Sequence, residues 1–244
     1  MSGKRRLAVL LLLAASAGCG TSDGPVTLSV AADSALTDVL PELGTVYHRL
    51  HPDLTVRTTF GGSRELVSDL TDGHRYADVL ITADQTSMNT AGYLKPSRDI
   101  AHVTMTIAVA PGNPLRIQGP GDLSRSGVRV SVAAPNDPAG RYAQEVFVRA
   151  GVAIRPIGAE IDVRTVLDRV RTGQADAGVV YLTDLRSAGA AAAGVAIPAA
   201  QNITATLPAA VLRKSRHQSA AKAFLAWLGS AEARAVLSAD GFQS

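Results

Sequence analysis

The chain has 244 residues, of which 46% are hydrophobic and 18% charged, and its formal net charge is +3. Three cations, Lys4, Arg5 and Arg6, lie in the basic start that precedes the apolar run LAVLLLLAASAG, so a chain without this leader is close to neutral. A neutral chain with 4% aromatic residues has neither a basic face for a phosphate backbone nor a set of aromatic side chains on which nucleic-acid bases could stack. The composition therefore argues against nucleic-acid binding.

The N-terminus predicts export and lipid attachment. The apolar run is too short to remain in a bilayer and is typical of a secretory signal. It ends in SAGC, which resembles the processing box of bacterial lipoproteins, so we expect residues 1–18 to be the signal peptide and Cys19 to be lipidated. Residues 19–26 are then a tether, and the mature chain is held by lipid on the extracytoplasmic face of the cell membrane. The alternative is an ordinary signal peptide with an incidental cysteine.

Cys19 is also the single cysteine, which excludes an intramolecular disulfide. About 220 residues follow the tether, enough for one large domain or two small ones.

The first half of this region alternates strand and helix patterns. Strands are predicted over 26–32, 54–60 and 77–83. Helices are predicted from Ser34, where Pro41 is expected to kink the helix, over 63–73 with Gly73 past the end, and over 85–94.

The second half repeats the alternation. Strands are predicted over 103–111, 127–135 and 175–184, the last of which runs into a turn, with helices over 137–151, 162–173 and 217–242. Residues 188–200 are predicted to form a solvent loop with a short strand. This alternation favours α/β architecture with mostly parallel sheets, in which ligands bind where strands end and helices begin.

Four predicted helix starts carry groups that suit an anion. Ser34 precedes one helix, Ser63 of GGS precedes another, Ala139 lies in the first turn after Asp137, and Val163 follows Asp162. Free N–H groups and the positive dipole end of each helix bind anions when they converge on one point. The same residues are also ordinary helix caps, so the pattern alone leaves both interpretations open.

Six segments resemble the periplasmic molybdate-binding proteins of bacterial ABC importers. AADSALTDVLPEL, TTFGGSRELVSDL and ADVLITADQTSM match the N-terminal half of that family, and DPAGRYAQEV, DVRTVLDRVRTGQADAGVVYLTD and the terminal GF match its C-terminal half. The resemblance implies a class II periplasmic-binding-protein fold, with two α/β lobes, two crossover strands and a cleft that closes on tetrahedral oxyanions. We expect lobe I to comprise 27–104 and 204–244, and lobe II to comprise 105–203.

The resemblance also assigns ligand residues. Matching the family position by position gives Ser34 and Ser63 in lobe I, and Ala139, Val163 and Tyr181 in lobe II. In the family, the first ligand serine directly precedes a Leu-Thr pair, whereas in this sequence Ala35 precedes Leu36 and Thr37. The loop after the first strand therefore donates to the ligand either through the Ser34 hydroxyl or through a backbone N–H alone.

The implied ligand is molybdate or tungstate, with no cofactor and no resident metal ion. The implied partners are the permease subunits of the importer, and we expect the protein to be a monomer.

Sulfate or phosphate is the alternative ligand, and Asp33 bears on the choice. A site that contains only donors should take molybdate, tungstate or sulfate, whereas a carboxylate repels a dianion and accepts the proton that hydrogen phosphate carries. Arg64 is within reach of a bound anion, but we expect a surface role because the helix starts already provide positive potential.

A hydrolase is a remote alternative, because GGSRE lacks the second glycine of a nucleophile elbow and no histidine lies in a recognisable motif. A receptor for a metal ion is another alternative, because His48 and His51 are three residues apart and share one face of a helix. Such a pair is more often simply exposed to solvent. We therefore expect a binding protein and no enzyme.

Overall fold

The computed structural model describes residues 24–243. The predicted signal peptide and the lipidation of Cys19 lie outside the described residues. Within residues 24–243, no helix is both long and apolar enough to cross a membrane.

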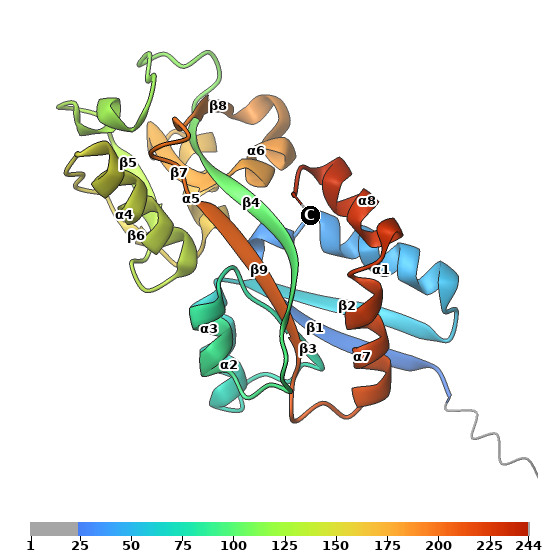
Figure 1. The fold of residues 1–244 in the computed structure, drawn as a ribbon. Helices are drawn as coiled ribbons and strands as arrows, with labels where there is room; N and C mark the ends of the chain where they lie inside the picture. Colours follow the sequence, from blue (N-terminus) through green and yellow to red (C-terminus); the bar gives the residue numbers. More distant parts are fainter. Residues whose placement is uncertain (1–23, 244) are drawn as a thin grey trace, which may run out of the picture.

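Lobe I is built on a parallel core of three strands. The order β2-β1-β3 is parallel throughout, and Asp33 at the end of β1 pairs with Gly61 at the end of β2. Helices α1, α7 and α8 lie together beside these strands, and α2 and α3 lie next to one another (Figure 1). The elements are β1 (Val26–Asp33), the 3-10 turn η1 (Ser34–Leu36), α1 (Val39–Leu50), β2 (Leu54–Gly61), α2 (Ser63–Thr71), β3 (Val79–Ile81), α3 (Gln85–Thr90), α7 (Gln218–Trp227) and α8 (Ala231–Asp240).

Lobe II has its own parallel core. β5 pairs in parallel with both β6 and β7, and α4 and α5 pack against these strands. The elements are η2 (Pro120–Ser124), β5 (Val130–Ala133), α4 (Pro138–Ala150), β6 (Ala159–Glu160), α5 (Val163–Arg171), β7 (Ala177–Tyr181), α6 (Leu182–Ala188), η3 (Gly189–Ala191) and β8 (Ala193–Ala196).

Two long strands connect the lobes. β4 (Arg98–Val109) and β9 (Thr204–Val211) run side by side and antiparallel between them (Figure 1). The first part of β4 pairs with β9, and the part from Met105 onward pairs with β7 and β8 of lobe II. The predicted class II fold, two α/β lobes joined by two crossover strands, is therefore confirmed. The exact lobe boundaries remain predictions.

Four details of the expected secondary structure are wrong. The single helix expected over 217–242 is divided into α7 and α8. Pro41 causes no kink, because α1 begins only at Val39 and a proline in the first turn removes no helical hydrogen bond. The expectation of mostly parallel pairing holds inside the lobe cores, but β4, β8 and β9 are antiparallel. The segment after Tyr181 forms the helix α6 rather than a turn.

Candidate functional site

The five predicted ligand residues come from element ends that converge between the lobes. The β1–β2 register places Asp33 beside Gly61, so the turns that follow these strands, with Ser34 and Ser63, are neighbours. From lobe II, α5 packs against η1. Burial raises the pKa of the Tyr181 hydroxyl, and the negative charges of Asp33 in lobe I and Asp137 in lobe II raise it further. Carboxylates of both lobes therefore lie near this hydroxyl. The structure thus brings both halves of the predicted set together.

On the lobe I side, the Asp33 carboxylate accepts hydrogen bonds from groups that were predicted to donate to the ligand. Its side chain is 3% exposed. Asp33 Oδ2 accepts from Ser63 N at 3.1 Å and from Ser63 Oγ at 2.5 Å, and Oδ1 accepts from Ala35 N at 3.1 Å. Ser63 Oγ in turn accepts from Ala83 N at 2.9 Å. Both donors of Ser63 are therefore directed at a carboxylate.

On the lobe II side, Asp137 plays a similar part. Asp137 is the N-cap of α4 and accepts from Ala139 N at 3.0 Å through Oδ1, so its carboxylate holds the predicted backbone donor of that loop. Asp162 caps α5 by accepting from Thr165 N at 2.8 Å. A Cβ on Gly62 would come within 2.6 Å of the backbone oxygen of Ile161 and within 2.8 Å of Asp137 Oδ2, so a glycine is needed where the lobes meet.

Three buried polar atoms at this junction have no partner among the described residues. They are Ser34 Oγ, Asp137 Oδ2 and the Tyr181 hydroxyl oxygen. Buried polar groups in native proteins are almost always hydrogen-bonded, and each exception calls for an explanation. Two hydroxyls and a carboxyl oxygen left free between two lobes are the arrangement expected of a polar ligand site.

Burial and mutual repulsion shift the pKa values of the carboxyls in this site. Burial raises the pKa of Asp33 to about 6, although its bonds to Ser63 and Ala35 lower it. Burial and the charge of Asp33 raise the pKa of Asp137 to about 8. The site is therefore not composed of donors alone, as a strict molybdate receptor would require, and it holds ionisable acceptors.

Arg164 connects the two lobes beside the site. Its Nε donates to Ser34 O at 3.3 Å and lies 3.1 Å from Asp184 Oδ1, and its guanidinium also pairs with Asp38 of lobe I. Asp184 is fully buried and accepts from Tyr181 N at 2.9 Å. One cation thus links the loop of Ser34 to the backbone of Tyr181.

A second set of contacts between the lobes lies around α4. The Tyr142 hydroxyl donates to Ala83 O at 3.0 Å, and Arg141 pairs with Asp84. Together with Arg164, these contacts hold the lobes against each other. Arg64 is exposed, as expected, and lines a groove of 310 Å³ over the junction together with Asp137 and Ile161.

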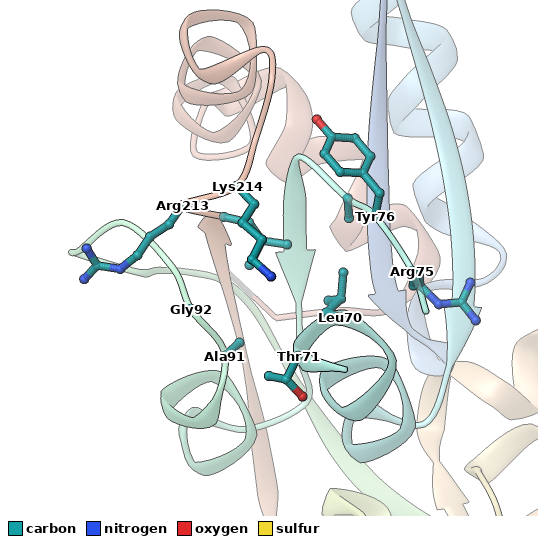
Figure 2. Close-up of a pocket in the computed structure, with 10 residues that line it drawn as sticks. Leu70, Thr71, Arg75, Tyr76, Ala91, Gly92, Arg213 and Lys214 are labelled. Atoms are coloured by element: carbon teal, nitrogen blue, oxygen red, sulfur yellow. The ribbon is translucent and has the colours of Figure 1, made fainter. Parts of the chain in front are cut away.

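Another pocket lies in lobe I, away from the predicted site. It has a volume of 240 Å³ and lies between Leu70 and Thr71 of α2, Gly92 after α3, and Arg213 and Lys214 after β9 (Figure 2). None of the five predicted ligand residues lines it. Its lining is mainly apolar, which does not suit a strongly hydrated oxyanion.

The sequence matches a known family along almost its whole described length. The model of the bacterial extracellular solute-binding proteins covers residues 28–243. The chain belongs to this family. A relative in Mycobacterium tuberculosis, the molybdate-binding protein ModA, is 33% identical over 232 residues, which span 93% of this chain and 88% of the relative.

Solved structures of solute-binding proteins have the same fold. The periplasmic molybdate-binding protein of Azotobacter vinelandii aligns with a TM-score of 0.75 at 18% identity, covering 89% of this chain and 99% of its own. The sulfate-binding protein SubI of Mycobacterium tuberculosis aligns with a TM-score of 0.77 at 19% identity, covering 89% and 86%. At these identities the structural matches establish the fold of this solute-binding protein and leave its ligand open.

Sequence reasoning missed the residues that join the lobes. No sequence motif marks Tyr142 or Arg164, because their contacts reach Ala83 and Asp38, which lie far away in the sequence. Asp137 and Asp162 were recognised only as caps. The one available signal was the position of Arg164 directly after Val163. Among residues 24–243, no three histidine, cysteine or acidic side chains are placed to hold a metal ion.

Proposed function

We propose that this solute-binding protein is the lipid-anchored receptor of an ABC importer, which captures molybdate or tungstate and delivers it to the permease subunits in the membrane. The observation that carries the proposal is the set of unpartnered buried polar atoms of Ser34, Asp137 and Tyr181 between the two lobes. The mycobacterial relative named as molybdate-binding supports the ligand class. In this role the protein acts as a monomer, needs no cofactor and catalyses no reaction.

The proposed ligand residues divide between the lobes. Ser34 and Ser63 would donate from lobe I, and the backbone of Ala139 and Val163 with the Tyr181 hydroxyl would donate from lobe II. A ligand that contacts both lobes stabilises the closed state by its higher affinity for that state. Closure then presents a surface formed by both lobes to the permease.

Sulfate or hydrogen phosphate is the second candidate ligand, and of these two anions the buried carboxyls of Asp33 and Asp137 favour hydrogen phosphate. An oxyanion that carries a proton can donate to a carboxylate, which a fully ionised one cannot do. The fold shared with the sulfate-binding protein SubI is compatible with sulfate as the ligand.

Calorimetric titration of residues 24–244 with molybdate, tungstate, sulfate and phosphate tests the proposal. We expect molybdate and tungstate to bind tightly and sulfate weakly. Phosphate binding as tight as molybdate would assign the site to a protonated oxyanion instead. No binding of any of the four anions would refute the proposed function.

A further inference from the structure

The carboxyl of Asp33 occupies the place that the proposed function gives to an anion. Asp33 accepts both donors of Ser63, and a hydroxyl or N–H that is directed at a carboxylate is not free for a second acceptor. Asp33 also lies in a buried cleft, so its negative charge and that of a dianion would face each other without water between them. An oxyanion can therefore use Ser63 only if the charge of Asp33 is removed.

We propose that Asp33 is a proton acceptor within the oxyanion site, so that each anion is bound together with one proton. The inference rests on the proposed function and deepens it. With a fully ionised anion such as molybdate, the proton comes from solvent and resides on Asp33, whose neutral carboxyl then donates to the anion. With hydrogen phosphate, the anion itself brings the proton and donates it in a hydrogen bond to Asp33.

The surroundings of Asp33 favour the neutral carboxyl. The ionisable groups that face it from lobe II are mainly acidic, and Arg164, which is bonded to the neighbouring Ser34 O, is already paired with Asp38 and Asp184. The pKa of Asp33, raised to about 6 by burial, agrees with uptake of a proton near neutral pH. The charged and titratable groups around Asp33 are Glu65 and the exposed Arg64 of α2, Asp137 and Tyr142 of the α4 region, Asp162 and Arg164 of the α5 region, and Tyr181 and Asp184 at the end of β7.

Asp137 does not replace Asp33 in this role at neutral pH. Asp137 accepts from Ala139 N rather than from Ser63, and burial and the charge of Asp33 raise its pKa, which favours its neutral form. Its unpartnered Oδ2 is then available as a hydroxyl donor or as an acceptor toward the anion. The two carboxyls are thus distinguished by the donors that each of them accepts.

The test is the number of protons taken up per molybdate bound, measured by calorimetry at pH 7 in two buffers of different ionisation enthalpy. Wild-type protein is expected to take up about one proton, and its affinity for molybdate is expected to fall about fivefold from pH 6 to 7 and about tenfold from pH 7 to 8. Hydrogen phosphate, which carries its own proton, is expected to bind without uptake.

The Asp33→Asn variant keeps an acceptor for Ser63 and removes the titration. At pH 7 it is expected to bind molybdate without the proton uptake of wild type, and its affinity is expected to change less than that of wild type between pH 6 and 8, so that it binds more tightly than wild type at pH 8 and about equally at pH 5. Asp176→Asn is the matched control, because Asp176 pairs with Arg129 at the surface of lobe II and has no part in the site. Its proton count should equal that of wild type.

Molybdate binding to wild-type protein without proton uptake, at an affinity constant from pH 6 to 8, would overturn the inference and leave the proposed function intact. A failure of every oxyanion to bind would refute both. The wild-type proton count decides the matter even if Asp33→Asn does not fold.

Discussion

Ser63 and Tyr181 are both proposed to donate to the ligand, but their surroundings differ. Tyr181 carries a fully buried hydroxyl with no partner among the described residues. Ser63 Oγ donates to Asp33 and accepts from Ala83 N. Removal of one oxygen therefore has different consequences for stability at the two positions, and similar consequences for binding.

Tyr181→Phe is expected to weaken oxyanion binding by about 1.5–3 kcal/mol, typical of a hydrogen bond to a charged partner, and to leave the unliganded thermal midpoint unchanged.

Ser63→Ala should weaken binding by a similar amount and also lower the unliganded stability by about 1–3 kcal/mol, since Ala83 N loses its acceptor. Titration calorimetry and thermal unfolding measure both effects. Wild-type affinity in a folded Tyr181→Phe protein would remove Tyr181 from the site.

The lipid anchor depends on a single residue outside the described part of the chain. Replacement of Cys19 with serine removes the proposed acceptor of the lipid, so the protein should be released from the membrane fraction. Fractionation with detection of the protein in membrane and medium measures this. Release of the unaltered protein into the medium, with an N-terminus other than residue 19, would contradict the proposal.

At the scale of the elements, the local sequence predicted the order of strands and helices well. Gly73 and Gly151 follow the ends of α2 and α4 with φ of +78° and +68°, as expected of residues past a helix end. The antiparallel pairing of β4 and β9 was beyond local reasoning, because it joins strands about a hundred residues apart in the sequence. The orientation of Asp33 follows from the pairing of β1 with β2 and could not be predicted either.

α4 depends on a glycine in its first turn, close to the proposed donor Ala139. A Cβ on Gly140 would lie 2.0 Å from Ala134 O and 2.5 Å from Ala133 O, both backbone atoms that end β5. Gly140→Ala should therefore displace the start of α4, lower stability by about 1–3 kcal/mol and weaken oxyanion binding. Gly121→Ala, where nothing lies within 4 Å, is the control. Equal thermal midpoints for the two variants would contradict this account of α4.

At the scale of the whole molecule, closure relies on a small number of contacts between lobes. The Tyr142 hydroxyl donates from α4 to Ala83 O in lobe I and makes this bond only when the lobes meet. Tyr142→Phe should speed oxyanion dissociation about two- to tenfold, the effect of one neutral hydrogen bond. Rapid-mixing measurements of the dissociation rate test it.

Tyr93→Phe is the matched control for closure, because the Tyr93 hydroxyl donates to Asn89 within lobe I at 3.2 Å. Its dissociation rate should match that of wild type. Equal rates for both variants would show that the Tyr142 contact does not contribute to the bound state.

The central claim is that an oxyanion lies between the lobes at the starts of η1, α2, α4 and α5 and beside Tyr181. A crystal structure of residues 24–244 grown with tungstate tests it most directly, because tungsten gives a strong anomalous signal that locates the anion without reference to the surrounding atoms. The account predicts one anomalous peak enclosed by Ser34, Ser63 and Tyr181. A peak only in the lobe I pocket at Arg213 and Lys214, or none in protein shown to bind tungstate, would contradict it.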